Sequence, residues 1–118
     1  MKAHTHLNCG RSGEELARGW LHGLGWHLLA RNWRCRLGEI DLIADDHGVL
    51  VFVEVKTRRS GRFGRGSLAV NALKLRRLER LATLYMQATG ERPCRLDVIS
   101  IDWPSGAPRI EHLQGVSQ

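Results

Sequence analysis

Two acidic residues and one lysine stand within the segments that otherwise look most like strands of a sheet. Glu54 and Lys56 are two positions apart in "VFVEVK", so in a strand both side chains project from the same face, about 7 Å apart. Asp41 lies in "EIDLIADD", and a hairpin turning at residues 46–48 would set its carboxylate beside that of Glu54. Adjacent carboxylates repel each other unless a cation lies between them, and hard oxygen ligands suit Mg²⁺ or Mn²⁺. The spacing therefore predicts a divalent metal site with Asp41 and Glu54 as ligands.

The same residues also have an ordinary structural interpretation. On a solvent-facing strand, Glu54 and Lys56 would form weak cross-strand ion pairs worth about 0.2–1 kcal/mol. What favours the metal site is the order of the surrounding segments, because the acid, the Glu-x-Lys pair, an arginine-rich loop and a basic helix follow one another along the chain.

Positive charge is concentrated just after these strands. The chain has 18 Lys and Arg against 12 Asp and Glu, a net charge of +6, whereas residues 56–80 hold nine basic residues and one acidic residue. Clustered Arg and Lys bind phosphates and release counterions, so this window predicts a nucleic acid as partner, with a solvated, solubilising surface as the alternative. The expected phosphate contacts, which position a backbone without reading bases, are Arg58, Arg59, Arg62, Arg65, Lys74, Arg76, Arg77 and Arg80.

Length and composition bound the class of protein. With 118 residues, 42% of them hydrophobic and 25% charged, the chain is expected to be one globular domain rather than a disordered or membrane protein. We expect a core at about 10–102, a flexible N-terminus at 1–9 and a tail at 103–118. No apolar run resembles a signal sequence or a membrane span, and the three cysteines form no close pair, which predicts free thiols and a cytoplasmic location.

The elements that would position the charged residues alternate between helical and strand patterns. Their order, α-β-β-β-α-β, predicts an α/β or α+β fold with a central mixed sheet and helices on one or both faces. The "DDHG" turn should join the second and third strands as a hairpin. The predicted elements are a helix at 13–24, strands at 27–35, 39–46 and 49–58, a helix from Ser67 to near Gly90, a strand at 94–103 and an edge strand at 110–113.

Local spacing gives some of these residues a structural role. The spacing of Ser12 and Glu15 predicts a capping box for the first helix, which would explain Glu15 but not its neighbour Glu14. Glu39 has no assigned role. Strand alternation places Ile40, Leu42 and Ala44 on one face of their strand, and Glu39, Asp41 and Ile43 on the other.

Two segments carry a family resemblance. "GEIDLIA" at 38–44 and "FVEVKTR" at 52–58 resemble the signature of the YraN family, predicted nucleases of the PD-(D/E)XK superfamily. The layout is also similar to that of archaeal Holliday junction resolvases. Ile40 stands where the superfamily's name has a proline. Across about residues 10–102, further matches in the same order are Gly13-Glu14 with Ala17, "RN" at 31–32, Lys74 and "LDV" at 96–98.

The resemblance implies a restriction-endonuclease-like fold, with Asp41 and Glu54 as metal ligands and Lys56 assisting catalysis. A bound Mg²⁺ would lower the pKa of a water and neutralise the phosphoryl oxygens. The carbonyl of Val55 would be a third ligand, and Lys56 would orient the water or stabilise developing negative charge. In resolvase-like enzymes a glutamate of the first helix joins the metal site, which gives Glu14 an accessory role and leaves Asp97 with a weaker claim.

We therefore expect a cytoplasmic nuclease, dependent on Mg²⁺ or Mn²⁺, that hydrolyses phosphodiester bonds of DNA, including branched or structured DNA in repair or recombination. The alternative is a non-catalytic nucleic-acid-binding module on the same fold, which needs the arginines but not the carboxylates. A protein-interaction domain that meets an acidic partner is a third interpretation. The sequence leaves open DNA against RNA, the cleavage position, and whether the protein is a homodimer.

Overall fold

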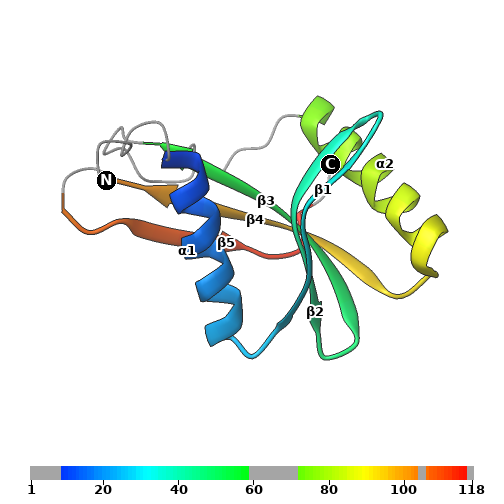
Figure 1. Ribbon diagram of the computed structural model, residues 1–118, viewed down its shortest axis with the longest axis horizontal. Helices are drawn as coiled ribbons and strands as arrows, with labels where there is room; N and C mark the ends of the chain where they lie inside the picture. The colour runs from blue at the N-terminus through cyan, green and yellow to red at the C-terminus, as the bar shows by residue number, and fades with distance from the viewer. Residues whose placement is uncertain (1–8, 59–71, 104–105, 117–118) are drawn as a thin grey trace.

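Five strands form one sheet, and their order across the sheet is their order along the chain (Figure 1). This computed structural model describes residues 9–58, 72–103 and 106–116, with side chains from Ser12 onward in the first helix. The predicted order of elements, including the edge strand, is confirmed. The elements are α1 (Cys9–Gly23), β1 (His27–Cys35), β2 (Gly38–Asp46), β3 (Val49–Arg58), α2 (Ala72–Thr89), β4 (Cys94–Asp102) and β5 (Arg109–Leu113).

The sheet is mixed. β1 with β2, β2 with β3, and β4 with β5 pair antiparallel, whereas β3 and β4 pair parallel. β2 and β3 form the predicted hairpin, closed at the pair Asp46–Val49 around His47 and Gly48, whose φ angles are 51° and 99°. Two successive positive φ angles match the twist of the strands in a two-residue turn. The parallel pair needs a crossover connection, which contains α2. These features confirm an α+β fold with a mixed sheet and flanking helices.

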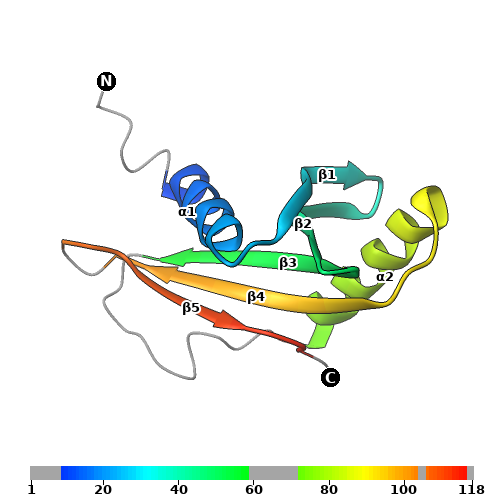
Figure 2. The ribbon, with the colours of Figure 1, turned by 90° about the horizontal axis from the view of Figure 1, so that it is seen from below.

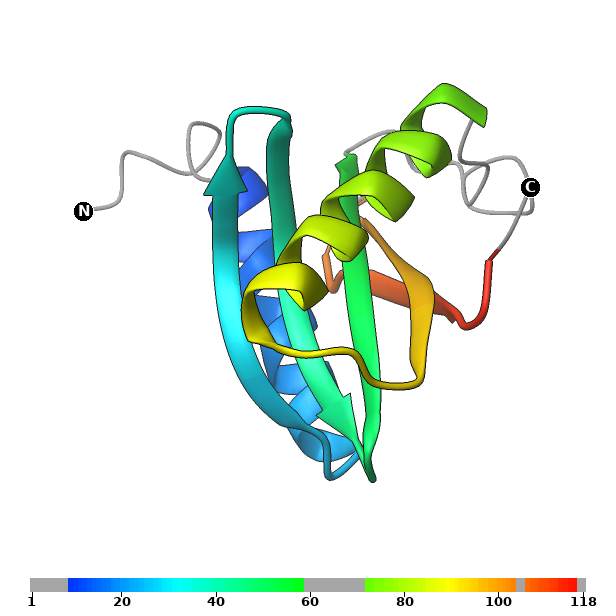
Figure 3. The same ribbon diagram turned by 90° about the vertical axis from the view of Figure 1, so that its right-hand side faces the viewer.

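The two helices cover opposite faces of the sheet (Figure 3). Alternation along β3 divides the core, because Val51 and Val53 pack toward α1 whereas Leu50 and Phe52 pack toward α2. The sequence had left both arrangements of the helices open. On the α2 side, the buried helical residues are Leu75, Leu78, Leu81 and Ala82.

The start of α1 differs from the prediction. The helix begins at Cys9, so Ser12 lies inside it, and the predicted capping box of Ser12 with Glu15 is wrong. Glu15 instead accepts hydrogen bonds from Arg18 and Arg31 at 2.6 and 2.9 Å. The predicted start of the second helix at Ser67 lies outside the described residues.

α1 approaches β3 closely at one glycine. A Cβ atom built on Gly13 would overlap the Cγ2 methyl of Thr57, so a side chain at this position would force the helix or the Thr57 side chain to shift. The close approach brings the next residue, Glu14, toward the sheet.

The β1–β2 hairpin changes face along its length, which corrects the prediction for Ile40. Leu42 packs on the α1 side, as alternation requires, but Ile40 packs on the α2 side together with its partner Trp33. The change occurs at Asn32, whose φ is 53°, in the strand position opposite Asp41. A left-handed residue within a strand interrupts the two-residue period. Figure 2 shows the outer part of the hairpin standing away from the plane of β3, β4 and β5.

Two further expectations can be compared with the described residues. Cys35 and Cys94 are free thiols, as predicted, and the side chain of Cys9 lies outside the description. Neither α1 nor α2 is long and apolar enough, within the described parts of the chain, to span a membrane.

Candidate metal centre

Three carboxylates converge where α1 meets β2. Among the described residues, Glu14, Glu39 and Asp41 form a group in which one carboxylate oxygen from each lies within 4.8 Å of the others. All three side chains are half-buried. We call these three residues the acidic cluster. Asp41 and Glu14 were predicted for the site, whereas Glu39 was missed, although its position two residues before Asp41 on the same strand was a signal for it.

Asp41 lies where β2 separates from β3. The last pair between these strands is Leu42–Val53, and beyond it the Asp41 side chain accepts the backbone N–H of Val55 at 2.8 Å. The pKa of Asp41 is raised to about 7, mainly by burial and also by the charges of Glu54, Glu14 and Glu39, against the lowering effect of the Val55 N–H. The ionised form of Asp41 is therefore costly until positive charge comes near.

Glu54 and Lys56 lie on the α2 side of β3, following Phe52 in strand alternation. Burial raises the pKa of Glu54, while the charges of Lys74, Arg77 and Lys56 oppose this effect. Burial also lowers the pKa of Lys56, helped by Arg58 and Lys74 and opposed by Glu54. Glu54 is outside the acidic cluster, but its charge acts on Asp41. Glu54 thus lies within electrostatic range of the cluster, and Lys56 lies within range of Glu54.

The donor atoms fit a hard divalent cation. Mg²⁺ takes oxygen ligands at about 2.0–2.1 Å, so that two ligands on opposite sides of the ion are roughly 4 Å apart. The carboxylate oxygens of the acidic cluster lie within 4.8 Å of one another, so a small movement of the side chains would let them bind one ion. A carboxylate-only donor set suits Mg²⁺ or Mn²⁺ better than the softer metals that prefer sulfur or imidazole. The role predicted for the Val55 carbonyl stays a prediction; its N–H orients Asp41.

Basic side chains flank the cluster on two elements. On α2, Lys74 and Arg77 act on Glu54, and the Arg77 side chain lies over Gly38, 3.7 Å from where a Cβ would stand. On β1, Arg34 contacts Glu39 at 3.2 Å with 75% of its side chain exposed, and Arg36 follows in the exposed turn. Figure 3 shows α2 crossing in front of β2 and β3. Sequence reasoning had missed the two β1-side arginines because they precede the basic window.

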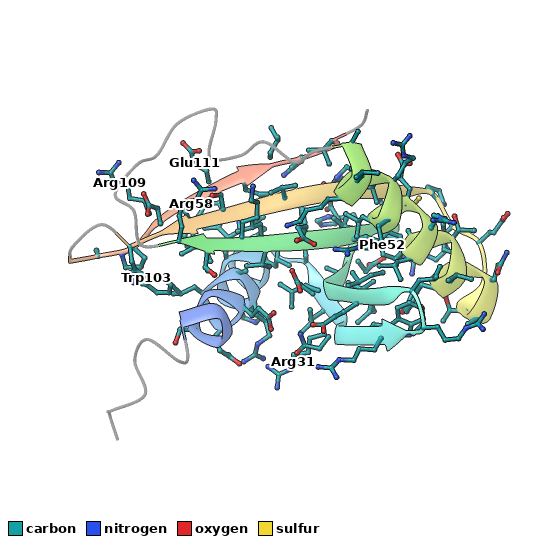
Figure 4. The ribbon with its side chains drawn as sticks, turned by 90° about the horizontal axis from the view of Figure 1, so that it is seen from above. Arg31, Phe52, Arg58, Trp103, Arg109 and Glu111 are labelled. Atoms are coloured by element: carbon teal, nitrogen blue, oxygen red, sulfur yellow. The ribbon has the colours of Figure 1, made fainter. Side chains whose placement is uncertain are left out.

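The remaining predicted phosphate contacts divide into three groups. Arg76 and Arg80 are exposed on α2 with Arg77. Arg58 lies at the far end of β3, in the region of Arg109 and Glu111 and away from α2 (Figure 4). The other predicted arginines fall outside the described residues: Arg59, Arg62 and Arg65.

Asp97 has a structural role, and its position does not support the less favoured prediction that it belongs to the metal site. Its fully buried carboxylate accepts two hydrogen bonds from Arg95 and one from the Gly115 N–H. The Trp20 indole donates to Nδ1 of His112 at 3.0 Å, which leaves the His112 Nε2–H to donate to Asp97 at 2.8 Å. Burial opposes ionisation here, but the bonds from His112 and Arg95 outweigh it and lower the pKa of Asp97.

The fold and the site together define the class: an α+β protein with a carboxylate cluster at the point where two strands of a mixed sheet separate. The family model of the uncharacterised protein family UPF0102 matches residues 13–101. The chain belongs to this YraN-like family, as its two signature segments suggested.

Relatives in several bacteria match most of the chain. A UPF0102 protein of Symbiobacterium thermophilum is 51% identical over 108 residues, covering 89% of this chain and 92% of the relative. One from Mycolicibacterium gilvum is 45% identical over 120 residues, with 98% of each chain covered. One from Nitrosococcus oceani is 44% identical over 117 residues, covering 97% of this chain and 94% of the relative. Their names give the family and no activity.

Proposed function

We propose that this protein is a metal-dependent nuclease of the PD-(D/E)XK type that hydrolyses phosphodiester bonds of DNA. The observation that carries the proposal is the convergence of Glu14, Glu39 and Asp41 within 4.8 Å, beside Glu54 and Lys56 on the next strand. An acidic centre surrounded by basic residues suits a reaction in which a cation and a polyanion must meet at one point.

The chain's own carboxylates would hold the ion. Asp41, Glu14 and Glu39 offer oxygen donors from α1 and β2, and Glu54 on β3, outside the acidic cluster, would be a further ligand. When bound, Mg²⁺ or Mn²⁺ supplies a water of lowered pKa and neutralises negative charge on the phosphoryl group. The Val55 N–H keeps the Asp41 carboxylate pointed into this space.

Lys56 provides positive charge on the same strand. Its ammonium lies within the electrostatic reach of Glu54 and of Lys74. From there it would orient the attacking water or stabilise the charge that develops on the phosphoryl oxygens. It acts in this role as a cation and does not need to lose its proton.

The flanking basic residues would hold the substrate backbone. Lys74, Arg76, Arg77 and Arg80 on α2, with Arg34 and Arg36 at the end of the β1–β2 hairpin, would offer positive charge to phosphates near the acidic cluster. Such contacts fix position without reading sequence, which favours recognition by shape and accords with structured or branched DNA.

The decisive experiment compares two aspartates on the same strand. Purified wild-type protein, Asp41→Asn and Asp45→Asn are incubated with linear, flapped and four-way DNA and with RNA, in Mg²⁺ or Mn²⁺. Asp45 pairs with Arg92 at the other end of β2 and serves as the matched control. We expect Asp41→Asn to lower cleavage by about 100-fold or more, with Asp45→Asn unchanged.

Two results would contradict the proposal. If none of these substrates is cleaved in a metal-dependent way, the protein is not the proposed nuclease. If Asp41→Asn cleaves as well as wild type, Asp41 does not belong to the active site. Salt-sensitive DNA binding that is indifferent to Asp41→Asn, without cleavage, would instead identify the non-catalytic binding module.

A further inference from the structure

Asn32 joins two members of the acidic cluster through one amide group. Its Nδ2 donates to Oε1 of Glu14 at 3.1 Å and to Oε2 of Glu39 at 2.7 Å. The two glutamates come from α1 and β2, and Asn32 comes from β1. Both protons of a single NH₂ group are thus used on carboxylates from two other elements.

The backbone at Asn32 is unusual for a strand. Its φ of 53° is in the left-handed region, which asparagine adopts more readily than most residues other than glycine. Asn32 occupies the position between the pairs Arg31–Leu42 and Trp33–Ile40, opposite Asp41. The residue that redirects the hairpin is therefore also the residue that contacts the two glutamates.

The neutral side chain matters for a cation site. The neighbouring Glu15 is bound by two arginines, which lower its pKa and neutralise its charge. Glu14 is bound instead by a carboxamide, which satisfies a carboxylate oxygen while leaving its negative charge in place. A lysine or arginine at position 32 would compete with a divalent ion for the same carboxylates.

We infer that Asn32 is a positioning residue that holds Glu14 and Glu39 in the orientation required for binding a divalent cation with Asp41. This inference rests on the proposed metal site and adds to it a residue that is not itself a ligand. It follows that removing the amide, without disturbing the backbone, should weaken the binding of the ion.

Asn32→Gly is the informative variant, because glycine adopts positive φ at little cost and lacks the amide. His47→Gly is the matched control, since His47 has nearly the same φ, 51°, in a turn at the other end of β2. Mn²⁺ affinity is measured by electron paramagnetic resonance of the free ion, and Tm is recorded with and without Mn²⁺. We expect Asn32→Gly to weaken Mn²⁺ binding by about 10–100-fold and to shrink the Mn²⁺-induced rise in Tm, with His47→Gly like wild type.

The control measurements separate this inference from the proposed function. If folded Asn32→Gly binds Mn²⁺ as tightly as wild type while Asp41→Asn binds it more weakly, the role of Asn32 is overturned and the metal site is not. If Asn32→Gly changes Tm by the same amount with and without Mn²⁺, and its Mn²⁺ affinity is unaltered, Asn32 is merely structural and the inference is again overturned. Wild-type Mn²⁺ affinity in Asp41→Asn would overturn the metal site and, with it, the inference.

Discussion

Asp41 and Asp97 are two carboxylates of the same sheet placed in opposite surroundings. Asp97 accepts hydrogen bonds from Arg95, His112 and a backbone N–H, and its pKa is lowered despite complete burial. Asp41 accepts one backbone N–H and otherwise faces carboxylates, and its pKa is raised to about 7. The protein supplies the positive charge that Asp97 needs.

The difference indicates what each residue is for. A buried carboxylate with a complete set of donors stabilises the fold and has little capacity left for a ligand. A carboxylate crowded by like charges lowers stability, and such groups are common where a protein binds an ion or carries out catalysis. Substitutions at the two positions should therefore change stability in opposite directions.

The largest effect is expected at Asp97. Asp97→Asn removes the buried carboxylate shared by Arg95 and His112, and leaves Arg95 paired with the less buried Asp46. We expect a loss of about 3–5 kcal/mol in the free energy of unfolding. Urea denaturation at pH 7 measures it, and a loss as small as that from an exposed ion pair would show that the network around Asp97 is dispensable.

Added metal should act on the Asp41 region alone. At 100 times its Kd, Mn²⁺ should raise the free energy of unfolding by about 2.7 kcal/mol in wild type and not in Asp41→Asn. Because the pKa of Asp41 is about 7 without metal, protons compete with the ion, so the gain should shrink from pH 8 to pH 6. Thermal melts at both pH values test this. If Mn²⁺ raises the free energy of unfolding as much at pH 6 as at pH 8, metal binding does not depend on the ionisation of Asp41.

Asp41→Asn without metal should stabilise the protein at pH 8. The pKa of Asp41 is raised from 3.8 to about 7 on folding, so the stability of wild type falls as the pH rises through that range. The whole shift corresponds to at most about 4 kcal/mol, and partial exposure to solvent reduces the expected gain to roughly 2 kcal/mol. Urea titrations should show this gain at pH 8 and its disappearance below pH 4; destabilisation at pH 8 would contradict it.

A smaller effect is expected where α1 touches β3. Gly13→Ala introduces a methyl that overlaps Thr57, while alanine improves the helix, for a net loss of about 1 kcal/mol. The displaced helix would also move Glu14 and weaken Mn²⁺ binding. Tighter Mn²⁺ binding would show that the present position of α1 is not the one the ion prefers.

Regular elements could be predicted from the sequence, and departures from regularity could not. Strand positions followed from alternation and turn residues, because the period of two and the "DDHG" turn are local properties. The packing of Ile40 could not be predicted, because a left-handed residue on the partner strand interrupts that period. The helix start was wrong because Ser12 resembles a cap even though the helix continues before it.

The sequence named only some of the residues that the structure brings together. Asp41 and Glu14 were named from their types and motif positions, and the spacing of Glu39 from Asp41 was a signal that was not used. The contact of Asn32 with both glutamates depends on the packing of α1 against the bent hairpin, which the sequence pattern does not show. The hydrogen-bond partners of Asp97 could not be predicted, because His112 and Gly115 come from the tail, where the sequence pattern is weak.

The acidic cluster draws on α1 and β2, and this origin has a kinetic consequence. Its members come together only after the helix has docked at Gly13 and the hairpin has bent at Asn32. If these contacts form after the main barrier to folding, the carboxylates of the acidic cluster repel one another in the native state but not yet in the transition state. A bound cation would then slow unfolding strongly while leaving the folding rate almost unchanged.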